Sequence, residues 1–305
     1  MAKYVAKRVG MMIVAMFLII LITFVIMHSV PGGPFTGDRN VSEEVEQALL
    51  AKYNLDAPLH EQFFQYLGGI LKGDFGPSYK YTGKSVNDFI ANGFPVSGKL
   101  GTVTVIFVLI AAIPMGIVAA VKNGRWQDMT IMAVATIGVT IPSFVIASVL
   151  IYVFSFKLNW LPTFGLESWK GYILPVVALG GYSISYISRL MRSSLLEVMG
   201  QDYIRTARAK GLSEFKVIFR HARRNALIPV ITVLGPTIAN LLTGSFVVEK
   251  IFAIPGLGVH FVNSVSQRDY TTIMGVTIFY AAFLMAMILL VDIFYCLIDP
   301  RIKFE

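Results

Sequence analysis

Charged residues are scarce in this 305-residue chain, at 14% of the sequence, whereas hydrophobic residues make up 55%. Soluble domains carry roughly 25% charged residues. The shortage is concentrated in long apolar runs, which excludes a large soluble core and indicates a protein that spans a bilayer. The net charge of +8 does not indicate nucleic-acid binding, because the basic residues lie between apolar runs rather than on one soluble face.

Residues that carry chemistry are also rare. The single cysteine, Cys296, lies in an apolar run, and the four histidines offer no metal-binding pair at helical spacing. Residues 83–85 imitate the end of a phosphate-binding loop, but Ser78 stands where that loop requires glycine. We therefore predict no catalytic residue, no metal site and no cofactor in this chain, and an intramembrane enzyme is disfavoured.

Six apolar runs meet or approach the roughly 20 residues that a membrane-crossing helix needs. We expect the first to be an uncleaved span, because no small-x-small cleavage site follows it. The fourth is the weakest, and it gains length if its helix continues past Arg189 and Arg192, whose side chains can reach the interface. The predicted spans lie near Val9–His28, Leu100–Val121, Met129–Phe156, Gly171–Ser188, Asn225–Val248 and Thr271–Ile298.

The distribution of Lys and Arg orients these spans. With the N-terminus inside, 16 of these residues fall on the cytoplasmic side and four in the short outer loops. The sequence therefore predicts an all-α polytopic membrane protein with six transmembrane helices and both termini in the cytoplasm. We expect residues 1–94 to form the first helix and an outward-facing segment, and residues 95–305 to form a five-helix core.

The segment over residues 30–94 is too polar to span a membrane and too long for a plain loop. Ser42 is a predicted N-cap for a helix that ends near Lys52. A second short helix is predicted over Leu59–Leu71, with Gly73 as its stop. The segment can serve as a docking platform for an external partner or as a lid on the outer helix ends.

The cytoplasmic loop at about 197–224 is the most informative stretch. Residues Tyr203–Lys210 have helix-forming composition, and Gly211 interrupts them. Ser213 can cap a second helix that carries an amphipathic stripe. The stripe consists of Phe215, Ile218, Phe219 and Ala222. Such an element can fill a groove on a partner protein or lie on anionic lipid, and the residue chemistry favours neither.

The same loop resembles the EAA loop of ABC-importer permeases, in which a Glu-Ala-Ala triplet is followed after three residues by glycine. Arg205, Thr206 and Ala207 stand at the triplet and Gly211 follows, with arginine in place of the acid. Its form resembles the variant of the dipeptide, oligopeptide and nickel branch. Further similar motifs are Val30–Pro34, Phe94–Ser97, Ile141–Phe144, Glu249–Gly258 and Arg268–Tyr270. Over essentially its full length the chain resembles the B-type permeases of bacterial oligopeptide importers.

This resemblance implies the type I ABC-importer permease fold and a non-catalytic subunit in the bacterial inner membrane that forms half of a path for oligopeptides. It implies as partners a second, C-type permease, two ATP-binding subunits that hold ATP and Mg²⁺, and an external peptide-binding protein. The loop would couple closure of the ATPases to the path. The implied coupling residues are Asp202, Tyr203, Ile204, Arg205, Thr206, Ala207, Arg208 and Gly211. Ala207 would let the ATPase approach closely, and Gly211 would permit the break between helices.

Asp292 lies within the sixth predicted span, where an ionised carboxylate is costly and is usually paired or faces water. We predict either a structural contact near Asp299 and Arg301 or a direct role in transport. The second role would suit a self-contained channel or an ion-coupled transporter, which is the alternative function. That alternative requires a selectivity filter, a charge-lined path or inverted repeats, and the sequence shows none of these beyond Asp292.

Overall fold

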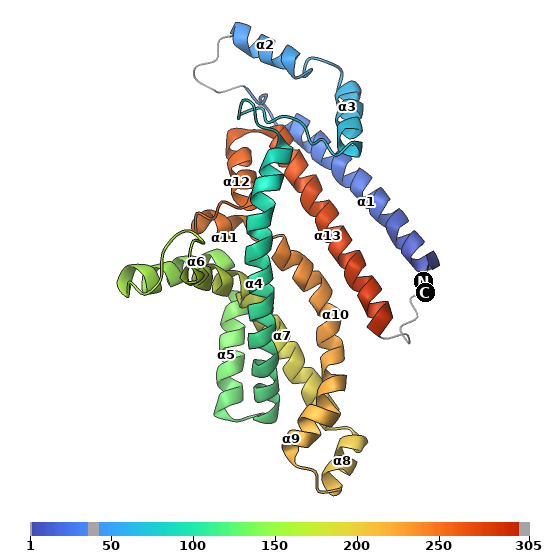
Figure 1. The fold of residues 1–305 in the computed structure, drawn as a ribbon, viewed down its shortest axis with the longest axis vertical. Helices are drawn as coiled ribbons and strands as arrows, with labels where there is room; N and C mark the ends of the chain where they lie inside the picture. The colour runs from blue at the N-terminus through green and yellow to red at the C-terminus, as the bar shows by residue number, and fades with distance from the viewer. Residues whose placement is uncertain (1, 36–42, 299–305) are drawn as a thin grey trace. The chain divides into compact units, whose positions relative to one another are not determined.

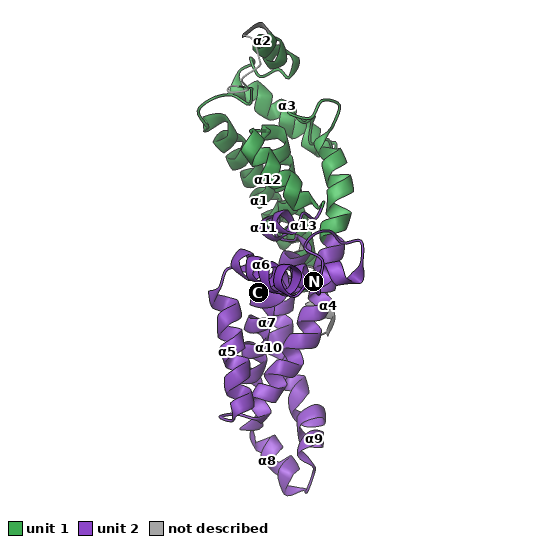
Figure 2. Cartoon of the chain, turned by 90° about the vertical axis from the view of Figure 1, so that its left-hand side faces the viewer, with its two compact units in different colours: residues 1–97, 255–305 green, residues 98–254 purple. Residues whose placement is uncertain are grey.

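The computed structural model describes residues 2–35 and 43–298, so the predicted cap Ser42 and the residues Asp299 and Arg301 lie outside the described part. The described chain is helical apart from turns and an isolated bridge between Pro77 and Ser85. It divides into two compact units, which Figure 2 shows in different colours. Unit 1 comprises residues 1–97 and 255–305, and unit 2 comprises residues 98–254.

Five helices are long and apolar enough to cross a membrane, and a bent helix pair makes a sixth if it is counted as one span. This result confirms the prediction of an all-α polytopic membrane protein. The long helices are α1 (Ala2–Ser29), α4 (Val86–Val121), α7 (Trp169–Met199), α10 (Arg223–Leu242) and α13 (Tyr270–Ile298).

In unit 1, α1 packs along α13, as Figure 1 shows, and both carry shorter helices at one end. These are α2 (Glu43–Lys52), α3 (Leu59–Leu71) and α12 (Leu257–Gln267). Helix α3 has the bounds that the sequence predicts, and Gly73 follows it with φ +78°, a conformation that suits glycine. The core that joins α1, α3 and α13 consists of Ile20, Phe24, Phe63, Met274 and Ile278.

In unit 2, α7 is the central helix and contacts helices on several sides. Its neighbours include α5 (Trp126–Thr140), α6 (Ser143–Leu150), α10 and α11 (Phe246–Ile251). A π-helix, η1 (Ile151–Lys157), continues α6. Half of the most apolar stretch of α7 is buried, the largest buried share among the candidate spans. A central position therefore explains why this span is the least apolar of the five.

Three predicted spans differ from the structure, and in one of them, Asn225–Val248, α10 ends at Leu242 and α11 begins after a short break. The run predicted as one helix over Met129–Phe156 is bent by 110° between α5 and α6. Pro142 explains the bend, because a proline disfavours the helical conformation of the residue before it, and Ile141 has extended angles of φ −88° and ψ 126°. Helix α4 begins at Val86, well before the predicted start at Leu100. The fourth span continues past Arg189 and Arg192 to Met199, as the sequence allows.

Glycines bring the helices of unit 2 into close contact with α7. A Cβ atom on Gly116 of α4 would lie 2.7 Å from the Ser188 carbonyl oxygen. One on Gly138 of α5 would lie 2.9 Å from the Gly181 carbonyl oxygen and would overlap the Ser185 side chain. Small residues of this kind let helix backbones approach in a membrane, where packing replaces the hydrophobic effect as the driving force.

Candidate functional site

The predicted coupling loop forms a compact helical tip at one end of unit 2. Helix α8 (Asp202–Ala209) and the short α9 (Glu214–Lys216) lie beyond the ends of α7 and α10 in Figure 1. A π-helix, η2 (Val217–Ala222), joins α9 to α10. The structure therefore places all eight predicted coupling residues together, as a short helix and the break that follows it.

One face of α8 packs on its own chain. Ile204 and Ala207 are buried in the core of unit 2, in a cluster that also contains Leu195 of α7. Ala207 thus packs against its own chain, and its small side chain lets α8 lie close to the rest of unit 2. Its predicted close approach to a partner stays a prediction.

The break after α8 is held by backbone conformation and by an ion pair. Gly211 has φ +77°, a backbone conformation that is strained for any residue with a Cβ. Apart from its chain neighbours, no atom of the described residues lies within 4 Å of the position that a Cβ on Gly211 would take. Across the break, Arg208 donates from Nε and Nη2 to the two carboxylate oxygens of Glu214, at 2.7 and 3.3 Å. Asn225 of α10 donates to the Tyr203 hydroxyl at 2.8 Å. These bonds fix the angle between α8 and the helix that follows.

The opposite face of the tip is exposed and combines charge with aromatic rings. Asp202 and Arg205 form an exposed ion pair at 3.5 Å. Phe215 and Phe219 are also exposed, and their rings stack 4.5 Å apart. The predicted stripe is thus divided, because Ile218 and Ala222 are buried. A π-helix has more residues per turn than an α-helix, so residues three positions apart, such as Phe219 and Ala222, lie on different sides. The predicted stripe assumed the spacing of an α-helix.

A partly buried ion pair that the sequence did not indicate ties α5 to α7. Asp128 accepts hydrogen bonds from Nε and Nη2 of Arg192, at 2.6 and 2.7 Å, and from the Gly124 backbone at 2.9 Å. Arg192 also donates to the Asn123 side chain. The expectation that Arg192 only extends to the interface is therefore incomplete. The missed signal was an acid at the start of one apolar run and a basic residue within another.

The acid in the sixth span has a partner on another helix. Nη2 of Arg8 in α1 lies 2.8 Å from Oδ2 of Asp292 in α13, which makes the two side chains an ion pair. Their relative orientation does not meet the angles of a hydrogen bond. Between the two predicted roles, this contact favours a structural ion pair that holds α1 against α13. The predicted neighbours beyond residue 298 lie outside the described residues.

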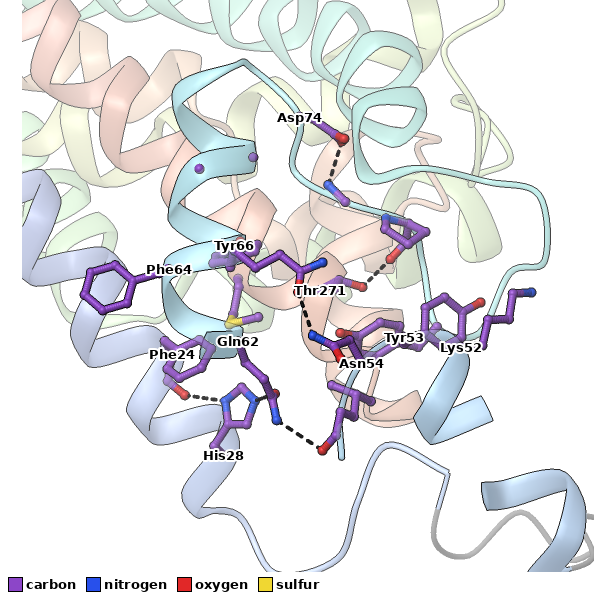
Figure 3. Close-up of a pocket in the computed structure, with 18 of the residues that line it drawn as sticks. Phe24, His28, Lys52, Tyr53, Asn54, Gln62, Phe64, Tyr66, Asp74 and Thr271 are labelled. Atoms are coloured by element: carbon purple, nitrogen blue, oxygen red, sulfur yellow. Dashed lines mark hydrogen bonds between the residues drawn. The ribbon is translucent and has the colours of Figure 1, made fainter. Parts of the chain in front are cut away.

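Residues of the segment predicted to face outward line a cavity of about 620 Å³ in unit 1, shown in Figure 3. His28 of α1 and Gln62 of α3 are hydrogen-bonded at 3.1 Å, and Gln62 donates to two carbonyl oxygens after α2. Tyr66 also lines the cavity, and its buried hydroxyl has no hydrogen-bond partner among the described residues. Burial, followed by the nearby Tyr79, raises the pKa of Tyr66 well above its ordinary value.

The loop before α4 is fastened to the start of α13 by Asp269. This fully buried carboxylate accepts hydrogen bonds from the hydroxyls of Ser78, Thr271 and Thr272 and from the Tyr79 backbone. Burial and, to a lesser degree, this carboxylate raise the pKa of Tyr79. The outer segment is therefore packed on α1 and α13 in part, as a lid would be, while Phe64 and Leu71 of α3 remain exposed as a docking surface would require.

The described residues form an all-α membrane protein with glycine-packed helices, ion pairs between helices and a projecting helical tip. No group of three or more His, Cys, Asp or Glu residues within the described part could hold a metal ion. A solved structure supports the fold. The MetNI methionine ABC transporter aligns with a TM-score of 0.53 and 18% identity, covering 67% of this chain and 95% of that one.

Sequence comparison identifies the family. Residues 112–304 match the family described as the binding-protein-dependent transport system inner membrane component, and residues 1–101 match the N-terminal part of such components. The dipeptide transport system permease protein DppB of Bacillus subtilis is 48% identical, covering 99% of this chain and 98% of its own length. The oligopeptide transport system permease protein OppB of Haemophilus influenzae is 43% identical over the full length of both chains.

The chain belongs to this family of membrane components, and the predicted class, a permease subunit of an ATP-driven importer, is confirmed. The resemblance to the peptide branch is confirmed as well, because the relatives match over the full length. The division at residue 94 and the roles of the individual loop residues stay predictions.

Proposed function

We propose that this chain forms half of a translocation path for oligopeptides in the inner membrane of a bacterium. The observation that carries the proposal is full-length identity of 42–48% to permeases named for dipeptide or oligopeptide transport. The chain itself performs no catalysis. We infer that two cytoplasmic subunits bind ATP and Mg²⁺, and that a second, C-type permease completes the path.

The exposed face of the helical tip supports coupling to an ATPase subunit. Tyr203, Arg205, Phe215 and Phe219 present rings and charge outward, while Ile204 and Ala207 fix the tip to unit 2. Aromatic residues and arginine on a rigid support are typical of groove-filling contacts. A helix that lies on lipid would need no such rigid attachment to α7 and α10.

We further propose that the outer segment receives an external peptide-binding protein. The exposed Phe64 and Leu71, together with the cavity over α3, offer an apolar surface with polar groups at its base. In the charge-based orientation this surface faces away from the cytoplasm. A binding protein docked here would release its cargo at the outer end of α1 and α13.

The first test is purification of the tagged chain from its native membrane in mild detergent, followed by identification of the proteins that accompany it. Two ATPases and a second polytopic permease are expected. The recovered complex should take up peptide into liposomes when ATP is supplied on the cytoplasmic face and the peptide-binding protein on the opposite face. Recovery of this chain alone, still transporting without ATP, would contradict the proposal and favour the ion-coupled alternative.

The second test concerns the break after α8. Gly211→Trp should abolish ATP-driven uptake while the chain still inserts and folds, because the new side chain projects where the ATPase must approach. Gly124→Trp is a matched control, since Gly124 also has a positive φ, of 72°, and open space around its Cβ position. Uptake by the Gly211 variant at the level of the control would remove the loop from the mechanism.

A further inference from the structure

The central helix of unit 2, α7, has a short exposed face in its middle part. Between Gly171 and Arg192, all described by the structure, only Tyr182 and Tyr186 are exposed. Their side chains lie one turn apart, with 58% and 42% of each residue exposed. The two rings are nearly parallel, at 8° and with 6.3 Å between centroids. The other residues of this stretch are buried or half-buried.

Both tyrosines lie near the middle of helix α7. Helix α7 extends about 46 Å at 1.5 Å per residue, and the Cα atom of each tyrosine is about 3 Å along the axis from the midpoint at Ile184. Tyrosine is enriched at membrane interfaces, where its hydroxyl meets water, and a pair of exposed tyrosines within a predicted span is unusual for a surface that faces lipid. One turn further on, Arg189 donates to the exposed Thr136 of α5 at 2.8 Å. An arginine within a span normally faces a water-filled cavity or a protein partner.

Helix α4 of the same unit provides the contrast. Its exposed residues between Val103 and Val118 are all apolar, as a lipid-facing surface requires. They are Val103, Ile106, Ile110, Pro114 and Val118. Both helices belong to unit 2, so the overall composition of the chain does not explain why the exposed residues are apolar on α4 and tyrosines on α7. The exposed face of α7 therefore has a different environment from the exposed face of α4.

We propose that Tyr182, Tyr186 and Arg189 line the water-filled part of the translocation path and that the paired tyrosine rings contact the passing peptide. This inference rests on the proposed function. Ring faces stack on apolar side chains and on peptide planes, and the hydroxyls exchange hydrogen bonds with backbone groups. Such contacts do not depend on peptide sequence. Arg189 donates its hydrogen bond to the neutral hydroxyl of Thr136, so this bond does not neutralise the guanidinium charge. The guanidinium can therefore pair with the carboxylate at the end of a peptide.

The test is thiol accessibility in the assembled transporter in liposomes. Cys296→Ser first removes the one native cysteine. Tyr182→Cys, Tyr186→Cys and the control Ile110→Cys are then each introduced. A membrane-impermeant thiol reagent is applied from either side, with and without ATP. The thiolate is the reacting species, and an apolar environment raises the thiol pKa, so the control should react at least about tenfold more slowly.

We expect the two α7 thiols to react and saturating transported peptide to slow the reaction. Reaction as slow as at Ile110 would overturn the proposal, because the face would then meet lipid or the second permease. Reaction that peptide does not slow would overturn the contact with cargo. Labelling by the reagent requires water access and does not require peptide transport. If the two thiols are labelled fast in a complex that hydrolyses ATP but imports no peptide, the proposed cargo is refuted, whereas the assignment of these residues to a water-filled path still holds.

Discussion

Asp128 is the residue whose replacement tests the packing of unit 2 most directly. Asp128→Asn keeps the size of the side chain but leaves the Arg192 guanidinium beside a neutral amide. Removing one partner of a buried ion pair costs about 3–5 kcal/mol of unfolding free energy. Because 26% of the Arg192 side chain stays exposed, and its bond to Asn123 remains, we expect a smaller loss of about 2–3 kcal/mol.

A double-mutant cycle isolates the pair itself. Arg192→Gln alone leaves the Asp128 carboxylate, with 5% of its side chain exposed, dependent on the Gly124 backbone. The double variant should lose less stability than the two single losses combined, with a coupling energy of about 1–3 kcal/mol. The measurement is unfolding of the purified chain by dodecyl sulfate in mixed micelles, followed by far-ultraviolet circular dichroism.

A coupling energy below about 0.5 kcal/mol, the usual scatter of additive mutations, would refute this assignment of the α5–α7 contact. The chain offers a matched control in the exposed pair of Asp202 and Arg205. Asp202→Asn removes the same charge from an ion pair that water already screens, so its unfolding curve should superimpose on that of the parent.

Two further predictions concern close contacts. Gly138→Ala places a methyl group against Ser185 and should lower stability by about 1–3 kcal/mol in the same assay, whereas Gly98→Ala, with no atom within 4 Å of the new methyl, should not. Equal curves for the two variants would contradict the packing of α5 on α7. Asp269→Asn replaces a buried acceptor by a group with two donors and should release the loop at Ser78. Limited proteolysis of the outer segment should become faster, and an unchanged rate would remove Asp269 from that role.

The elements that the sequence predicts well are those determined by local pattern. Helix α3 has its predicted bounds, and the break at Gly211 lies where composition places it. The bend at Pro142 was harder to predict, because proline also occurs inside continuous spans, as Pro175 does in α7. Local sequence cannot distinguish these cases. Neighbouring helices decide whether the freed backbone groups are satisfied within a straight helix.

The contacts that the sequence missed join residues far apart in the chain. Asp128 and Arg192 are separated by 64 positions, and neither is unusual at the end of an apolar run. The packing direction of α8 was not predicted for a similar reason, since a helix with one buried and one exposed face does not reveal which face meets its own chain. Only the packing of Ile204 and Ala207 against α7 settles the direction.

One continuous core links the two ends of the proposed mechanism. Helix α7 carries Tyr182 and Tyr186 near its middle and ends at Met199, and its residues Met191 and Leu195 share the buried cluster with Ile204 and Ala207 of α8. A core packed to crystal density has low compressibility and transmits displacement. A force applied to α8 by a partner should therefore move α7 as one body with it. The buried Ala207 is suited to this role because a larger side chain would separate α8 from the helix that it has to move.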